Sequence, residues 1–363
     1  MKKAVGISTV LGIVLLGLAI AIPCLRAGET SSATSYQVLA PIRHGNLTIF
    51  PVVSTRSHDT GQFLPLDEGL RSGEVVVTEA GNVSPLVRPR HPHPNWQENR
   101  PGGGAEVNRL VLVNNSKKPL LLLAGEIVTG GKQDRIIGKD RLVPGESDPI
   151  DLGVFCVEPG RWVGSSAKFG GAGAMGGIVQ PSVRSKAMAA QNQQQVWDEV
   201  GKARAATAVA VPSVEVTSSY AGVMQNEEVQ KKLDSVAAPV ERDYQSVISQ
   251  LRDKNAVGVV VAVNGEVIWA DVFASTKLLE KYWPKLVRSY AAESMVQQAR
   301  SASADMKSAQ EFLDRLQGRR EVVENEPGLY RHTEVSGDGF KVFELTSLLP
   351  NTGFDLHVAK MSE

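Results

Sequence analysis

The segment LAGEIVTGGKQDRII, residues 123–137, concentrates hydrogen-bonding side chains at the end of an apolar run. A Gly-Gly bend follows the apolar residues, and a cation, an amide, a carboxylate and an arginine come directly after it. Arginine offers a planar fork that matches carboxylate or phosphate oxygens, and glycines let backbone N–H groups approach an anion. The pattern predicts a site for a small anionic or polyhydroxylated ligand. Its candidate residues are Glu126, Lys132, Gln133, Asp134 and Arg135.

A second group of polar residues lies further along in VFCVEPGRW, residues 154–162, and adds Glu158, Arg161 and Trp162. If the strands that carry the two segments are neighbours, both groups share one rim. Charge combined with an aromatic ring is typical of a small-ligand or glycan pocket. The alternative is a solvated hairpin tip held together by ion pairs, and the sequence leaves both interpretations open.

A hydrolase of a phosphorylated or glycosidic bond is the main alternative function. Glu126 or Glu158 would act as acid or base, Arg135 or Arg161 would bind the anion, and Cys156 is a less favoured nucleophile. The residues lack a recognisable catalytic spacing, which favours a non-catalytic binding or envelope-interaction module. A third interpretation is a scaffold whose helices after residue 177 bind a membrane partner.

Familiar cofactor and catalytic motifs are incomplete. Residues 171–176 fit G-x-G-x-x-G, but they do not follow a buried strand of the dinucleotide-binding kind. Lys132 lacks the spaced glycine and the hydroxyl residue of a phosphate-binding loop, and neither H-E-x-x-H nor G-x-S-x-G occurs. His91 and His93 lie between prolines, which favours an exposed loop over a metal site. No cofactor and no metal are therefore predicted.

The N-terminal segment, residues 1–27, has the pattern of an export signal. Two lysines precede an uncharged run from Ala4 to Pro23, and Ala27 is a plausible cleavage position. The run is also long enough to remain as a membrane anchor. Cys24 follows a proline rather than a small residue, which disfavours lipidation. The sequence predicts a periplasmic or extracellular body, with an inner-membrane anchor as the alternative to cleavage.

Composition excludes some partners. Lys and Arg total 39 and Asp and Glu total 39, and loss of residues 1–27 removes three bases, which leaves a net charge of −3. Such a chain lacks the positive excess of a nucleic-acid-binding protein, and we expect no nucleic acid partner. Cleavage also leaves Cys156 as the one cysteine, so no internal disulfide is predicted. Its apolar neighbours predict that this thiol is buried.

Residues 28–163 carry the signals of an antiparallel β domain, in which short apolar runs alternate with turn-forming residues. Runs at 109–113 and 119–128 flank the polar NNSKK and predict a hairpin. Residues 143–146, VPGE, predict a turn before the strand that contains Cys156. The Pro- and Gly-rich segment 88–104 predicts a surface loop.

Residues 164–182 predict a Gly-rich linker, and residues 183–363 predict a second domain that mixes helices and β-hairpins. Apolar spacing predicts a helix around Val196 and another that starts near Pro239. Asn264-Gly265 between two apolar runs predicts a central type I′ hairpin. Further helices are expected at 276–299, interrupted by Pro284, and at 304–317. Strands at 329–334, 340–345 and 353–359 complete the chain.

The chain resembles a bacterial family, the ARG and rhodanese-phosphatase-superfamily-associated protein domain. The segments that carry the resemblance are LAGEIVTGGKQDRII, VFCVEPGRW, AVGVVVAVNGEVIWADVF and LVRSYAAES. The resemblance covers residues 36–358. The family has no assigned biochemical function. Its name implies association with ADP-ribosylglycohydrolases and with rhodanese or phosphatase domains, so the resemblance implies an ADP-ribose-like or phosphate-bearing ligand by association alone.

The sequence thus predicts an exported α+β protein with an N-terminal, sandwich-like antiparallel β part and a C-terminal part of helices and hairpins. The predicted function is ligand binding or interaction with an envelope protein at the charged rim. The membrane would be contacted only through residues 1–27, and only if they are not cleaved.

Overall fold

The structure is a computed structural model, and it describes residues 36–80, 106–172, 177–215, 217–300 and 302–363. The predicted signal segment, the loop at 88–104 with His91 and His93, and two glycines of the G-x-G-x-x-G match lie outside the described residues. In the part of the chain that the structure describes, no helix is long and apolar enough to cross a membrane.

Valine-rich and aromatic runs build the largest sheet, which has nine strands, all paired antiparallel. The strand order is β1-β3-β13-β14-β18-β17-β16-β15, and β2 pairs with β3. The bounds are β1 Tyr36–Val38, β2 Ile42–His44, β3 Leu47–Ser54, β13 Asn255–Val263, β14 Glu266–Phe273, β15 Arg319–Glu326, β16 Tyr330–Gly337, β17 Phe340–Ser347 and β18 Asp355–Ser362. This sheet therefore contains strands from both predicted domains, residues 28–163 and 183–363. The division of the chain into two domains at these residues stays a prediction.

Two smaller sheets form the remainder of the N-terminal β part. A six-stranded sheet has the order β12-β8-β9-β11-β6-β5, and a three-stranded sheet has the order β10-β7-β4. Leucine and valine side chains of both sheets fill one shared core, as in a sandwich. The bounds are β4 Leu64–Pro65, β5 Val75–Glu79, β6 Arg109–Asn114, β7 Leu120–Leu122, β8 Ile127–Thr129, β9 Arg135–Ile137, β10 Arg141–Val143, β11 Ile150–Cys156 and β12 Gly170–Gly171.

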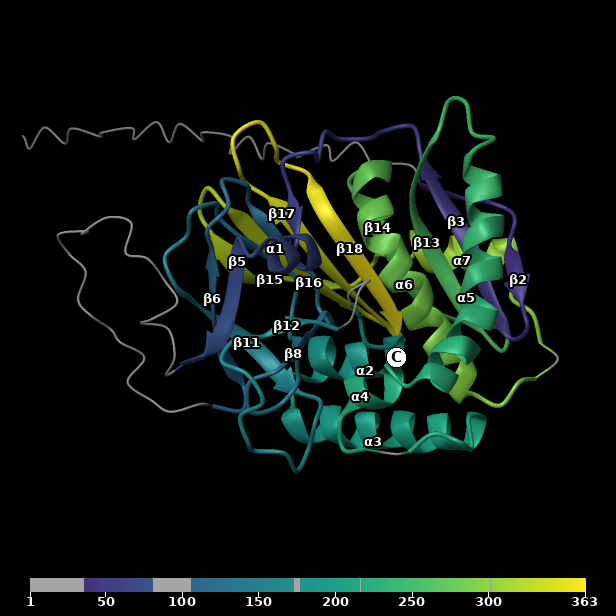
Figure 1. The fold of residues 1–363 in the computed structure, drawn as a ribbon. Coiled ribbons are helices and arrows are strands. Elements are labelled where there is room, and N and C mark those ends of the chain that lie inside the picture. The colour runs from purple at the N-terminus through teal and green to yellow at the C-terminus, as the bar shows by residue number, and fades with distance from the viewer. Residues whose placement is uncertain (1–35, 81–105, 173–176, 216, 301) are drawn as a thin grey trace, which may run out of the picture. The chain divides into compact units, whose positions relative to one another are not determined.

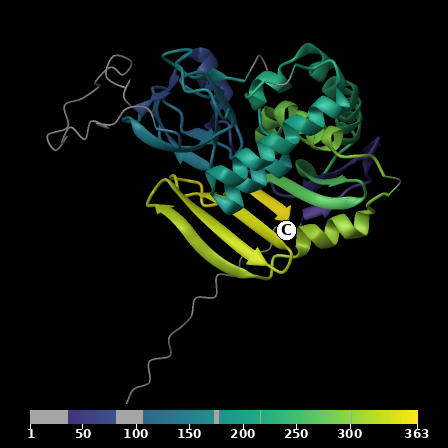
Figure 2. The same cartoon turned by 90° about the horizontal axis from the view of Figure 1, so that it is seen from below.

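Helices cover both faces of the large sheet. The α-helices are α1 Leu66–Ser72, α2 Pro181–Ser185, α3 Gln193–Ala210, α4 Tyr220–Met224, α5 Glu227–Ile248, α6 Thr276–Val296 and α7 Met306–Asp314, and a π-helical turn spans Lys186–Ala190. Side chains alternate between the two faces of a strand. Val259 and Val261 therefore join the core beneath α6, whereas Val260 and Ala262 join the core beneath α7. Figures 1 and 2 show α6 and α7 on opposite faces.

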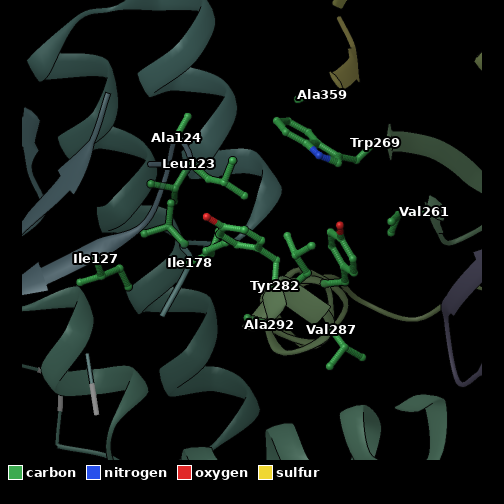
Figure 3. Close-up of a cluster of buried hydrophobic side chains, with 14 of the residues drawn as sticks. Leu123, Ala124, Ile127, Ile178, Val261, Trp269, Tyr282, Val287, Ala292 and Ala359 are labelled. Atoms are coloured by element: carbon green, nitrogen blue, oxygen red, sulfur yellow. The ribbon is translucent and has the colours of Figure 1, made fainter. Parts of the chain in front are cut away.

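The core beneath α6 joins the large sheet to the N-terminal β part. Tyr282 of α6 points toward Leu123 and Ile178 (Figure 3), and its hydroxyl donates a 3.0 Å hydrogen bond to the Leu121 carbonyl. Trp269 of β14 belongs to the same cluster. The predicted α+β fold is confirmed, with these parts packed on one another.

Several predicted elements are confirmed. Asn264 and Gly265 both have positive φ angles, 53° and 81°, as a type I′ turn requires, and the β13–β14 hairpin is central in the large sheet. The hairpin of β16 and β17 and the turn at 145–146 also form as expected.

The predicted hairpin between 109–113 and 119–128 is wrong. Strand β6 pairs with β5 and β11, whereas β7 pairs with β10 and β4 in the other sheet. Asn114 fixes this crossover, since its side-chain amide donates to the carbonyls of Lys118 and Pro144 at 2.8 and 3.0 Å. Both runs are apolar on both faces, so periodicity could not select their partners.

The predicted effects of the two helical prolines, Pro239 and Pro284, are also wrong. Helix α5 begins at Glu227, so Pro239 lies inside it rather than in its first turn, and α6 continues through Pro284 without interruption. Asn226 caps α5 by accepting from the backbone N–H groups of Glu228 and Val229. Burial of an apolar stripe stabilises each helix enough to offset the missing proline N–H. Helix α7 is shorter than expected, and Met306 and Leu316 are exposed.

The segment at 164–177 is more structured than the linker expected there, as far as it is described. Phe169 is buried in the sandwich core, and Gly170–Gly171 pairs with β8. The flexibility of the linker stays a prediction.

A buried ionic network joins the large sheet to the N-terminal β part. Asp271 of β14 accepts from Arg184 Nη1 at 2.9 Å, from Trp269 Nε1 at 2.9 Å and from the Tyr290 hydroxyl. His357 of β18 lies between the two carboxylates, 3.0 Å from Asp271 Oδ1 and 2.5 Å from Asp140 Oδ2. The four ionisable side chains that carry the network's charge are fully buried.

The charges of this network balance. Burial alone would raise the pKa of Asp271, but the charges of Arg184 and His357 hold it well below its usual range. Burial alone would lower the pKa of His357, but Asp140 and Asp271 raise it above its usual value. With His357 protonated, two carboxylates thus meet two cations. Removal of one partner leaves an uncompensated buried charge.

We expect Asp271→Asn to destabilise the protein by about 3–5 kcal/mol, because the two buried cations Arg184 and His357 are then left with the single carboxylate of Asp140. Urea unfolding measures the free energy of unfolding. The matched control is Glu228→Gln, which breaks the exposed Lys231–Glu228 ion pair on α5 and should cost less than about 1 kcal/mol. Equal losses in the two variants would contradict a stabilising role for the network.

The contribution of His357 should depend on pH. Its pKa is higher in the folded than in the unfolded chain, so its stabilisation is fully present below about pH 6.5 and is lost as pH rises through the folded pKa. The difference in unfolding free energy between the parent and His357→Asn should therefore shrink on the alkaline side. Urea unfolding at a series of pH values measures it, and a constant difference would count against this assignment.

Candidate functional site

The loop that joins β8 to β9, residues 130–134, carries three of the eight candidate residues, Lys132, Gln133 and Asp134. Gly130 and Gly131 have positive φ angles of 127° and 51°. A Cβ on Gly131 would lie 2.2 Å from the Phe169 ring and 2.6 Å from a Glu79 carboxylate oxygen, so glycine is required there. The absence of a side chain at Gly131 leaves room for the Glu79 carboxylate, which accepts a 2.7 Å hydrogen bond from the Lys132 backbone N–H. The Gly-Gly bend thus packs the loop against β5.

Glu158 holds this loop to the segment that follows β11. Its Oε2 accepts from the Asp134 backbone N–H at 3.0 Å and from Arg161 Nη2 at 2.6 Å, and its carbonyl accepts from Gln133 Nε2 at 3.0 Å. The Arg161 guanidinium also lies 3.6 Å from Asp134 Oδ1. The two sequence segments therefore form one cluster, and the pairing of β9 with β11 meets the condition under which a shared rim was expected.

The cluster is largely buried, in contrast to a solvated hairpin tip. The residues Gln133, Asp134 and Arg135 are at most 8% exposed. Asp134 accepts a 2.7 Å hydrogen bond from the Ser219 hydroxyl, and burial is the main cause that raises its pKa. The loop is therefore fixed from beneath by α4, whose N-cap is Ser219.

Arg135 is the most unusual group of the cluster. Its side chain is fully buried, yet its one hydrogen bond in the described structure is a 3.5 Å contact from Nη1 to the Asp134 carbonyl. Its Nε and Nη2 have no hydrogen-bonding partner among the described residues. Burial lowers the pKa of this guanidinium. Five donors in a planar fork are thus mostly unused.

Trp162 lies over the cationic side of the cluster. Lys132 Nζ is 5.0 Å and the Arg135 guanidinium carbon 6.0 Å from its ring centroid. The tryptophan is 43% exposed, so its ring is open to solvent. An exposed ring beside two cations provides a surface on which a planar or sugar-like group can pack.

Glu79 belongs to this cluster although sequence reasoning missed it. It is buried at the end of β5, and among the described residues its Oε2 has no hydrogen-bonding partner, as is also true of Gln133 Oε1. The signal that could have identified Glu79 is its position near the end of the apolar run EVVVTEA. The site thus holds unpaired acceptors as well as unpaired donors.

The structure does not bring Glu126 into this cluster. Its buried carboxylate accepts from Lys285 Nζ and from the Leu123 backbone N–H, each at 2.7 Å. Burial is the main cause that raises its pKa. Lys285 also donates a 2.8 Å hydrogen bond to Asp67. Glu126 is bound to Lys285 and the Leu123 backbone, whereas Glu158 is bound to Asp134 and Arg161, so the two carboxylates belong to separate hydrogen-bond networks.

Cys156 is fully buried, which confirms the sequence prediction. It lies opposite Arg135 in the pairing of β11 with β9. Burial raises the pKa of the Cys156 thiol, which disfavours the thiolate. Within the described ranges, no group of three or more His, Cys, Asp or Glu side chains is placed to hold a metal ion.

We expect Cys156 to react with iodoacetamide at least about a hundredfold more slowly in the native than in the unfolded protein, because reaction requires local opening. The full chain with Cys24→Ser leaves a single thiol, and mass spectrometry measures its alkylation. A urea-unfolded sample is the control. Equal rates in both samples would show that the thiol is accessible and would reopen a nucleophilic role.

Comparison with known proteins gives one match. Residues 35–359 match the family model described as the ARG and Rhodanese-Phosphatase-superfamily-associated Protein domain. A search of curated proteins and a search of solved structures each found no match. The match spans nearly all of the described residues and agrees with the resemblance seen in the sequence motifs. The chain belongs to the family of the ARG and Rhodanese-Phosphatase-superfamily-associated Protein domain.

Proposed function

We propose that the chain is a non-catalytic ligand-binding module whose ligand is polyhydroxylated and carries an anionic group. The observation that carries this proposal is the buried Arg135 guanidinium with unpaired Nε and Nη2. Leaving a buried donor unpaired costs about 1–3 kcal/mol, and more when the group is charged. An anionic group at this position would accept two parallel hydrogen bonds from the arginine fork.

The charges and acceptors around Arg135 support a ligand with hydroxyl groups. Three cations are balanced by three carboxylates in the cluster, namely Lys132, Arg135 and Arg161 against Glu79, Asp134 and Glu158. A balanced cluster does not favour a small polyanion. Gln133 Oε1 and Glu79 Oε2 are acceptors without partners and would take hydroxyl donors.

Trp162 supplies the apolar contact. Its exposed ring lies beside both Lys132 and Arg135, so a sugar ring packed on it would have its anionic substituent near the guanidinium. Because Arg135 itself is fully buried, binding of the anionic group requires side chains around the guanidinium to move.

The family name adds a class of probe by association. It links the domain with ADP-ribosylglycohydrolase and phosphatase partners, which makes ADP-ribose a suitable test molecule. We also propose that the module works outside the cytoplasm, on the pattern of residues 1–27, either with its small ligand or with an envelope protein.

We expect one of ADP-ribose, ribose 5-phosphate or glucuronate to raise the thermal unfolding midpoint of the protein. At 100 times its dissociation constant a ligand adds about 2.7 kcal/mol. Lys132→Ala and Trp162→Ala should remove most of the shift, because they delete the cation and the ring of the proposed site. Both side chains are partly exposed, so their loss should preserve the fold.

The matched controls are Lys202→Ala and Met306→Ala, which change an exposed lysine and an exposed apolar side chain elsewhere. Both should keep the full shift. A shift that persists in Lys132→Ala and Trp162→Ala would place the ligand elsewhere. If no ligand of the panel shifts the parent, the small-ligand proposal fails and an envelope protein becomes the partner to test.

A further inference from the structure

A cavity of about 460 Å³ lies away from the Arg135 cluster, between α4, α5, α6 and the start of β8. Small-molecule sites commonly have volumes of about 300–1,000 Å³. None of the eight candidate residues from the sequence lines this cavity. It is therefore a separate candidate for ligand binding.

Most of the cavity wall is apolar. The strand and loop side contributes Ile127 and Ile178, and the helices contribute Ala221, Met224, Leu233 and Ala292. All six side chains belong to the core cluster beneath α6, so the wall is continuous with the packed interior. Packed neighbours fix the shape of such a wall, which favours an apolar ligand body.

Two cations of α6 line the cavity one turn apart, and they differ in their availability. Lys285 is 2% exposed and donates to both Asp67 and Glu126 at 2.8 and 2.7 Å. Burial would lower its pKa, but these two carboxylates raise it. Lys285 is therefore neutralised by buried partners and does not attract a ligand anion.

Arg288 is held more weakly. It donates to Asp234 and to Gln230, both on α5, and the Asp234 side chain is 55% exposed. The Arg288 side chain is 17% exposed and the Asp234 side chain 55% exposed, so solvent screens this ion pair from the Asp234 side. A ligand carboxylate could therefore replace Asp234 on this guanidinium at little cost, and Arg288 is the wall's available cation.

We propose that this cavity binds an amphiphilic monocarboxylate, whose apolar body fills the cavity and whose carboxylate pairs with Arg288. A single negative charge fits better than two, because Asp234 stays close to the same guanidinium and would repel a dianion. Arginine matches the planar carboxylate through two parallel hydrogen bonds. The proposal concerns a second site and does not depend on the function proposed for the Arg135 cluster.

The test is calorimetric titration of the full chain with octanoate and with octanamide, its uncharged analogue. The parent should bind octanoate at least about tenfold more tightly, because a charge-assisted hydrogen bond is lost in the amide. In Arg288→Gln this preference should disappear. Arg242→Gln, which changes a 75% exposed arginine of α5, is the matched control and should keep the preference.

Filling the cavity provides an independent arm. Ala292→Phe, or Ala221→Leu if the first variant does not fold, should weaken both octanoate and octanamide by at least about tenfold because the apolar body loses its space. Trp162→Ala should leave octanoate binding unchanged, which separates this site from the Arg135 cluster.

The proposal is overturned if the parent binds neither compound, or if octanoate keeps its advantage in Arg288→Gln. It is equally overturned if the folded cavity-filling variant binds octanoate as the parent does, since octanoate then lies elsewhere. Loss of the octanoate preference in Arg288→Gln, together with weaker binding of both compounds by the filled variant, supports it.

Discussion

The carboxylate of Asp271 is the interaction on which the packing of this chain depends most. It lies in the middle of an apolar strand and is reached by a guanidinium, an imidazole, an indole and a phenol, all from buried side chains. Arg184 also donates to the Ala124 carbonyl, and the Ala124 N–H donates to Asp140. The backbone of Ala124 thus links Arg184 to Asp140 within the same network. Because low polarity around it makes any missing partner costly, a different packing of the large sheet on the N-terminal β part would leave a buried charge unpaired.

The same constraint positions the two candidate ligand sites. The segment 123–126 leads from the ionic network into β8, and the Arg135 cluster begins where β8 ends. Glu126 in this segment is fixed by Lys285 of α6, whose next turn carries Arg288 in the cavity wall. Each site is built on an element whose orientation the buried charges determine. Rigid placement of this kind is what precise recognition of a small ligand requires.

The Arg135 cluster and the cavity differ in the kind of ligand they suit. The cluster has balanced charges, unpaired donors and acceptors and one exposed ring, which suits a ligand rich in hydroxyl groups. The cavity has apolar walls and one weakly held arginine, which suits an apolar molecule with a single charge. Burial and hydrogen bonding, rather than the identity of the charged residues alone, make this distinction.

The sequence by itself determined the elements whose signals are local. Asn264-Gly265 specifies its hairpin because both residues adopt positive φ at low cost, and the polar segments after residues 129 and 157 predicted a shared cluster. Only the tertiary structure decided the partners of β6 and β7, the continuation of α5 through Pro239 and the separation of Glu126 from Arg135. Asp271 inside its apolar strand was a visible sign of a buried charge, but its partners Arg184 and His357 are distant in sequence. Local signals reflect backbone preferences of neighbouring residues, whereas pairing and charge compensation depend on contacts between distant segments, which a single sequence does not encode in any local pattern.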